Sequence, residues 1–130
     1  MKVIRNNIIP FSGFKAVTFW PFVFVRKKAT FSRTDETHEK IHGEQQIEML
    51  FIGMVIAAIL AVWGCGWWSL LALPIFFYWY GIEWLIKAAF YLSFSIAYKE
   101  IGFEREAYQF EDDYYYLNHR KSFKWIKMLW

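Results

Sequence analysis

The sequence predicts a mainly helical membrane protein, with a transmembrane helical hairpin, a small N-terminal β-sheet and a C-terminal cytosolic helix. The chain is 57% hydrophobic and 23% aromatic, an apolar share above that of a typical soluble domain. Its charges are segregated, because Met49 to Ile82 contains no Lys, Arg, Asp or Glu. Gly64-Cys65-Gly66 lies inside this run and supplies flexible backbone for a tight reversal. At 130 residues, we expect a single domain over 1–130.

Residues 1–33 are expected to form an extended arm. Its apolar runs are rich in β-branched and aromatic side chains, which favour strands, and Pro10, Gly13 and Pro21 interrupt them. The runs are Val3-Ile4, Ile8-Ile9, Ala16 to Phe19 and Phe22 to Val25. A sheet of two or three strands is therefore predicted.

A continuous helix is expected over residues 34–64. Ser32 is followed three residues later by Asp35, a spacing that resembles a capping box. Only Gly43 and Gly53 interrupt the helix-forming residues, so the helix is predicted to run without a break into the membrane.

A helix crosses the hydrocarbon core in about 20 residues, so the uncharged run is too long for one span. It is slightly too short for two spans, so flanking residues must contribute to them. We expect spans at about 48–64 and 67–87, with an extension of the second span to residue 98. This extension is expected to be a helix that emerges along the membrane surface or into the cytosolic arm. Aromatic residues at the span ends are expected to form interfacial belts. These are Trp63, Trp67 and Trp68 at the tip, and Trp79, Tyr80 and Trp84 at the other interface.

Both polar arms lie on one side of the predicted hairpin. Eight of the 15 Lys and Arg residues precede the uncharged run, seven follow it, and the tip has none. By the positive-inside rule, we expect both termini to be cytoplasmic. The chain is expected to be an integral protein of a bacterial inner membrane. The formal net charge of +3 is spread over both arms, which indicates contact with the lipid bilayer rather than nucleic acid. The N-terminus shows no cleavable signal pattern, so the first span is expected to direct insertion.

The segment 103–130 is expected to hold one further helix, Glu104 to Leu117, and a basic, aromatic tail at the membrane interface. Glu83 and Lys87 are four residues apart in the favourable order and are expected to form a structural ion pair. The single cysteine, at position 65, excludes an internal disulfide and is interpreted as a small packing residue.

His38-Glu39-Lys40-Ile41-His42 is an H-E-x-x-H motif. On a helix, residues four apart share a face, so both imidazoles can bind one Zn²⁺ while Glu39 activates its water. The alternative is that both histidines lie on a solvated turn and Glu39 is an ordinary surface charge. A third protein ligand decides between these readings, because catalytic zinc takes three protein ligands and keeps one open position.

Phe103-Glu104-Arg105-Glu106-Ala107-Tyr108 supplies the candidate third ligand. Together the two motifs resemble the gluzincin metallopeptidases, especially the membrane groups typified by the CAAX prenyl endopeptidases and the β-lactam sensor-transducer peptidases. They also resemble the soluble mini-gluzincins that cleave phage repressors. In these families an E-x-x-A-D or E-x-x-A-N pattern on a later helix provides the third zinc ligand through its first Glu.

Carried over residue by residue, the resemblance implies that His38, His42 and Glu104 are zinc ligands and that Glu39 is the general base. Glu106 is a competing ligand, but two residues along a helix it faces away from Glu104. The resemblance also implies that the segment Pro21 to Lys28 is the edge strand to which a substrate adds.

The resemblance covers roughly Pro21 to His42 and Phe103 to Glu111, with two departures. Tyr108 stands where the family has Asp or Asn, and Glu111 stands where it usually has a small residue. Glu111 lies two turns after Glu104 on about the same face, so our hypothesis is that it replaces the carboxylate that orients a ligand histidine.

His119 has two interpretations. It could donate a hydrogen bond to an oxyanion, as histidines and tyrosines do in related enzymes, or it is a surface histidine beside Arg120.

The motifs favour a membrane-embedded zinc endopeptidase that hydrolyses membrane or membrane-proximal peptide substrates with zinc-activated water. His42 precedes Met49 by about 10 Å of helix, which places the metal at the interface. The alternative is a non-catalytic small membrane protein with a structural metal site or an adaptor role. Two spans bury little surface against each other, so a homo-oligomer is expected.

Overall fold

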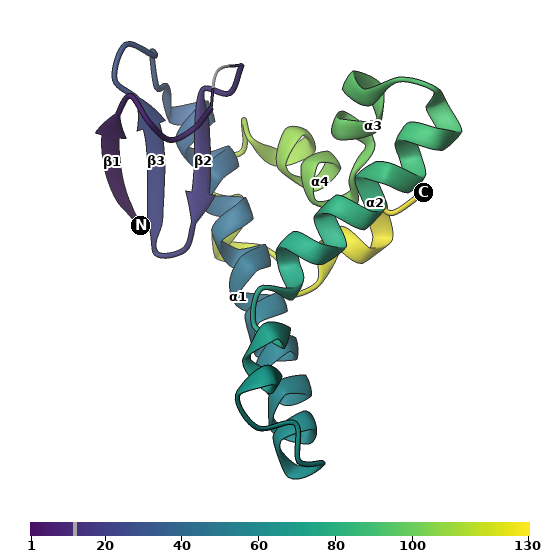
Figure 1. The fold of residues 1–130 in the computed structure, drawn as a ribbon. Helices are drawn as coiled ribbons and strands as arrows, with labels where there is room; N and C mark the ends of the chain where they lie inside the picture. The colour runs from purple at the N-terminus through teal and green to yellow at the C-terminus, as the bar shows by residue number, and fades with distance from the viewer. Residues whose placement is uncertain (12) are drawn as a thin grey trace.

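The computed structural model describes residues 1–11 and 13–130 and is mainly helical, with a small three-stranded sheet (Figure 1). This confirms the expected helical class and N-terminal sheet. In chain order the elements are β1 (Lys2–Asn6), β2 (Ala16–Phe19), β3 (Phe22–Arg26), α1 (Arg33–Val62), η1 (Gly66–Ala72), α2 (Ile75–Tyr91), α3 (Phe94–Glu100), α4 (Gly102–Phe110), α5 (Tyr116–His119) and η2 (Lys124–Met128), where η denotes a 3₁₀ helix.

The sheet has the strand order β1-β3-β2, with β1 parallel and β2 antiparallel to β3. The prediction that Pro21 to Lys28 forms an edge strand is wrong, because β3 is paired on both sides. The short Phe19 to Phe22 connection pairs β2 with β3, and the N-terminal strand then occupies the other side of β3. The edge strand nearest α1 is therefore β2, which the helix contacts directly.

Helix α1 begins as the capping box predicts. The Ser32 hydroxyl accepts a hydrogen bond from the Asp35 backbone N–H at 3.1 Å, and the Asp35 carboxylate accepts one from the Ser32 N–H at 2.7 Å. The helix is continuous over 30 residues, as expected. Its N-terminal half is buried against β2 and α4, whereas its C-terminal half exposes apolar side chains, including Phe51, Ile59 and Val62.

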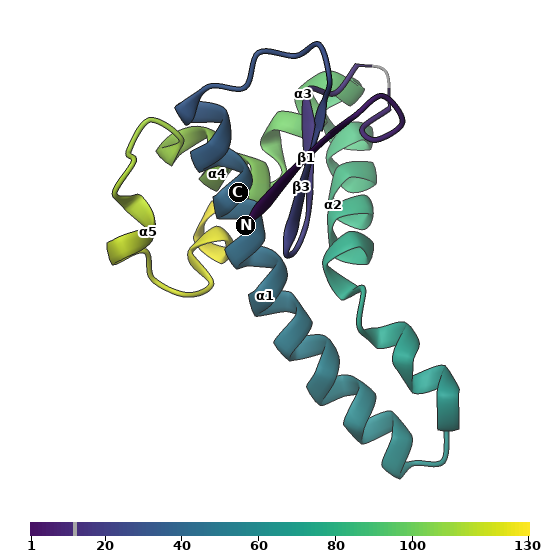
Figure 2. The ribbon, with the colours of Figure 1, turned by 90° about the vertical axis from the view of Figure 1, so that its left-hand side faces the viewer.

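The hairpin of α1 with η1 and α2 extends away from the sheet, with its tip far from both termini (Figure 2). Gly64 and Gly66 form the predicted reversal with positive φ angles of 89° and 53°. The arms pack closely at Gly53, where a Cβ atom would lie 2.5 Å from the Ala72 carbonyl oxygen. Cys65 is exposed at the tip, so its expected packing role is wrong. The three tip tryptophans, Trp63, Trp67 and Trp68, are exposed there as well.

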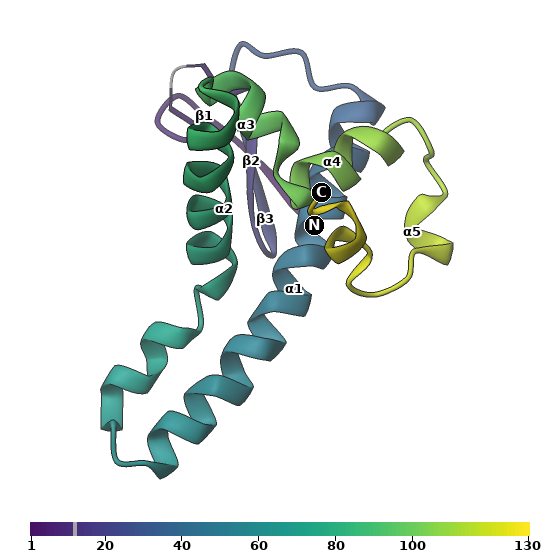
Figure 3. The ribbon, with the colours of Figure 1, turned by 90° about the vertical axis from the view of Figure 1, so that its right-hand side faces the viewer.

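The second arm, expected over 67–98 as a span and its extension, is divided into η1, α2 and α3 (Figure 3). The 3₁₀ helix η1 and α2 meet at an angle of 54°, because Pro74 at the junction has no backbone N–H to continue the ladder. Helix α2 ends at Tyr91, its C-cap Leu92 has a left-handed φ of 52°, and α3 is a separate helix. Tyr80 and Trp84, which were expected at an interfacial belt, line an open cavity.

The C-terminal helix is shorter than predicted. Helix α4 ends at Phe110, because the Asp113 carboxylate accepts a hydrogen bond from the Tyr115 N–H at 3.0 Å and stabilises a turn instead. The predicted ion pair between Glu83 and Lys87 is present at 2.9 Å. A hydrophobic core then joins α1, α2, α4 and η2 through Met49, Phe76, Ile101, Phe103 and Trp125.

Helix α1 is long and apolar enough to cross a membrane. Among the described residues, η1 and α2 pass the same test only when they are taken together as one bent pair. Only 28% of the apolar window of α1 is buried within the protein.

Candidate metal centre

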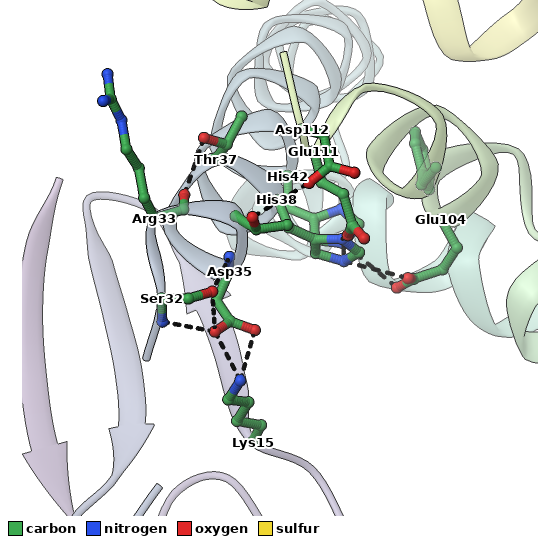
Figure 4. A network of polar contacts seen from close by, with 12 residues as sticks. Lys15, Ser32, Arg33, Asp35, Thr37, His38, His42, Glu104, Glu111 and Asp112 are labelled. Atoms are coloured by element: carbon green, nitrogen blue, oxygen red, sulfur yellow. Dashed lines mark hydrogen bonds and ion pairs between the residues drawn. The ribbon is translucent and has the colours of Figure 1, made fainter. Parts of the chain in front are cut away.

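Two histidines from α1 and one glutamate from α4 converge in the interior (Figure 4). His38 and His42 lie one turn apart on the same helix face, with their Nε2 atoms 3.1 Å apart. Glu104 brings its Oε2 within 3.4 Å of His38 Nε2 and its Oε1 within 3.3 Å of His42 Nε2. All three residues are buried, and the structure thus assembles the group that the two sequence motifs indicated.

The hydrogen bonds of the two Nδ1 atoms show that the Nε2 atoms face the space between His38, His42 and Glu104. His38 Nδ1 lies 2.8 Å from Glu111 Oε2, and His42 Nδ1 lies 2.8 Å from Gln45 Oε1. Both partner atoms are acceptors, so each neutral ring carries its proton on Nδ1 and directs the Nε2 lone pair at the other ring.

A cation bound between His38, His42 and Glu104 would satisfy acceptor atoms that otherwise face one another. Glu104 Oε2 is buried and has no hydrogen-bond donor among the described residues. Two Nε2 lone pairs that face this carboxylate oxygen without a donor between them are costly to bury. Tetrahedral zinc, with ligand bonds of about 2.0–2.1 Å, separates its ligand atoms by about 3.4 Å, close to the three separations found here. The residues present therefore fit a metal ion of this class.

The electrostatics of the cluster also favour positive charge. Burial lowers the pKa of His42, but the adjacent Glu104 carboxylate raises it by more, to about 9. Burial raises the pKa of Glu104, and the His42 and His38 rings outweigh this effect and lower it. Without a metal, the group thus holds a proton between His42 and Glu104.

Metal affinity is expected to rise with pH up to about 9. Below the raised pKa of His42, a metal ion must displace the proton, so affinity falls by up to about tenfold per pH unit for one proton. Above that pKa the dependence levels off. Titration calorimetry in buffers of different ionisation enthalpy should show about one proton released per Zn²⁺ bound near neutral pH. Affinity that stays constant between about pH 6 and pH 8 would contradict this.

The candidate base, Glu39, is also buried and lines the same cavity. The Thr18 hydroxyl of β2 donates a hydrogen bond to Glu39 Oε2 at 2.7 Å. Gln46 fixes β2 against α1, because its side-chain amide donates to the Thr18 carbonyl at 2.7 Å and its oxygen accepts from the Trp20 N–H at 2.8 Å. Sequence reasoning missed Thr18 and Gln46, since their contacts join positions more than 20 residues apart.

A cavity of about 960 Å³ opens from the cluster between β2 and the α2–α3 arm. Its walls are largely aromatic, and the rings of Phe19 and Phe77 meet across it at 5.1 Å. Tyr80 was also missed from the sequence, and its hydroxyl donates to Glu104 Oε1 at 2.7 Å. The main aromatic residues of the walls are Phe14, Phe19, Phe76, Phe77, Tyr80, Trp84, Phe94, Tyr98 and Tyr108.

Of the other candidate site residues, two contact His38 and two lie away from the cluster. Glu111 makes the hydrogen bond hypothesised for it, to His38, and Tyr108 packs its ring against His38 at a centroid distance of 4.8 Å. Glu106 faces away from the cluster and is fully buried among other partners. His119 is exposed beside Asp113 at 3.6 Å and does not line the cavity, so the geometry gives no support to an oxyanion role.

The outer edge of β2 borders the cavity. The Arg26 N–H bonds the Lys15 carbonyl, so in this antiparallel ladder Ala16 and Thr18 direct their backbone groups away from β3. The Thr18 carbonyl is taken by Gln46, which leaves the Thr18 N–H and both backbone groups of Ala16 at the edge.

No family model, curated protein or solved structure matches the chain.

Proposed function

We propose that this chain is an integral membrane zinc endopeptidase that acts on membrane or membrane-proximal proteins. The observation that carries the proposal is the convergence of two Nε2 lone pairs and the Glu104 carboxylate, with ligand atoms within 4.8 Å and Glu39 beside them. Two imidazoles and one carboxylate form the ligand set of catalytic zinc, which leaves a fourth position for water or substrate.

Zinc bound at this group would lower the pKa of its water toward about 7 and polarise a substrate carbonyl. Glu39 follows His38 directly in the helix, so its carboxylate is supported as the group that takes a proton from the attacking water and returns it to the leaving amine. The Thr18 hydroxyl holds one Glu39 oxygen and leaves the other for this exchange.

The edge of β2 supports an extended peptide as the substrate. Backbone groups of Ala16 and Thr18 lie at this edge beside the candidate metal and base, where a substrate strand could add to the sheet. The aromatic walls of the cavity suit apolar side chains of that strand.

The exposed apolar surface of the hairpin supports its insertion in a bilayer. A soluble core helix of this length would be mostly buried, yet 28% of the apolar window of α1 is buried. Exposed Trp63, Trp67 and Trp68 at the tip suit one interface, and the charged residues at the base of the hairpin suit the cytoplasmic side. Apolar faces left over on α1 and α2 favour self-association within the membrane.

A structural metal in a non-catalytic protein is the second candidate. The deep burial of all three ligand residues favours it, since Glu104 is only 2% exposed and a metal there would tie α4 to α1. A Glu39 variant separates the two functions. If the protein is a peptidase, the variant loses the cleavage that native protein shows and still keeps its zinc.

Glu104→Gln is expected to lower zinc affinity by more than about 100-fold, because removal of a ligand exceeds the 10–100-fold effect of removing a group that orients one. Elemental analysis of detergent-purified protein should find one zinc per native chain and little in the variant. Glu100→Gln, the same change at a partly exposed position on α3, serves as the matched control. Zinc-free native protein after purification in zinc-supplemented buffer would refute the metal site.

A further inference from the structure

Gln45 is the fully buried contact of His42 on the side away from the candidate metal. It lies on α1, one turn after His42, and its side chain spans the gap between α1 and α4. The Gln45 Oε1 atom lies 2.8 Å from His42 Nδ1, and Nε2 donates to the Phe103 carbonyl at 3.1 Å and to Glu106 Oε2 at 2.9 Å.

These contacts fix the orientation of the Gln45 amide. Both neighbours of its nitrogen are acceptors, so a flipped amide would face the Phe103 carbonyl and the Glu106 carboxylate with an oxygen. Oε1 must therefore face His42, whose Nδ1 must carry the proton. The amide thus selects the tautomer that directs the Nε2 lone pair toward Glu104.

Glu106 accepts hydrogen bonds from groups of the C-terminal segment. Arg120 donates to it from Nε at 2.6 Å and from Nη2 at 3.1 Å, and the Tyr116 hydroxyl donates at 2.8 Å. The Arg120 guanidinium also pairs with Glu48 on α1. A chain of buried hydrogen bonds therefore runs from Arg120 through Glu106 and Gln45 to His42.

We propose that Gln45 is a positioning residue of the metal site, and that the buried Arg120–Glu106 pair orients His42 through it. The inference rests on the metal binding of the proposed function, but it does not require peptide hydrolysis. A buried amide is suited to this position, because it accepts from the imidazole and donates to a carboxylate without adding a second charge beside Glu106. Residues 116–120, which do not touch the metal ligands, thereby acquire a role in metal affinity.

Gln45→Met keeps the length of the side chain and removes its hydrogen bonds. We expect zinc affinity about 10–100-fold below native, an altered visible spectrum of the Co²⁺-substituted protein, and loss of the hydrogen-bonded Nδ1–H signal of His42 in ¹⁵N NMR. The Nδ1–H signal reports the tautomer itself, which a purely structural role of Gln45 would not set. Gln109→Met, at an exposed position on α4, is the matched control and should match native protein in all three measurements.

A second variant keeps the test valid if Gln45→Met fails to fold. Gln45→Glu alone places a carboxylate against Glu106, whereas Gln45→Glu with Glu106→Gln exchanges amide and carboxylate at constant charge. The double variant should recover most of the affinity lost in Gln45→Glu. Native affinity and an unchanged His42 signal in Gln45→Met, or no recovery in the double variant, would overturn the inference alone. Absence of zinc binding by native protein would overturn the proposed function together with it.

Discussion

Glu39→Gln is expected to reduce peptide cleavage by about 10²–10⁴-fold, the usual contribution of a general base, while one zinc per chain remains bound. Glutamine keeps the shape of the side chain and can still accept from the Thr18 hydroxyl. It cannot take a proton from water at neutral pH. Because the substrate edge and the metal ligands are untouched, the loss should fall on kcat and leave KM within a few fold.

The measurement uses a fluorescence-quenched peptide with apolar residues on both sides of the scissile bond, presented with the protein in detergent micelles. Glu44→Gln, an exposed position on the same helix, is the matched control and should cleave at the native rate. Cleavage by Glu39→Gln at more than about a tenth of the native rate would assign the base to another group. Stoichiometric zinc with no native cleavage would favour the structural-metal alternative.

Arg120→Met is expected to destabilise the fold by about 3–5 kcal/mol, the effect of removing one partner from a buried ion pair. The Arg120 side chain is 5% exposed and contacts Glu106 and Glu48, whose side chains are 0% and 10% exposed. Burial lowers the pKa of Arg120, but its bonds to Glu48 and Glu106 raise it by more, so the guanidinium is always charged. Without it, two buried carboxylates lose their counter-charge.

Denaturant unfolding of the detergent-solubilised protein, followed by tryptophan fluorescence, measures the change. Arg105→Met is the control, since that side chain is 36% exposed and its nearest carboxylate oxygen, on Glu100, is 3.8 Å away, so its effect should stay within about 0.5 kcal/mol. Adding Glu48→Gln and Glu106→Gln to Arg120→Met should restore much of the stability, because no uncompensated charge then remains. A loss below about 1 kcal/mol for Arg120→Met alone would show that water reaches the two carboxylates.

Features of the fold that depend on neighbouring residues could be predicted from the amino-acid sequence. Ser32 and Asp35 set the start of α1, and Gly64 and Gly66 set the reversal, because capping and left-handed backbone are decided within a few residues. The 3.6-residue period of the helix is enough to bring His38 and His42 onto one face. The continuity of α1 followed in the same way from the absence of strong helix breakers.

Features that join distant segments of the chain could not be predicted in this way. The order of the strands, the inward turn of Tyr80 and the chain from His42 to Arg120 depend on which surfaces pack together, and no local pattern encodes that choice. Glu104 was named by the resemblance of its motif, but its approach to the histidines requires α4 to close on α1 across more than 60 residues. Burial of the core around Phe103 and the Arg120–Glu106 ion pair hold α4 against α1. The metal centre therefore forms only when these distant segments pack together.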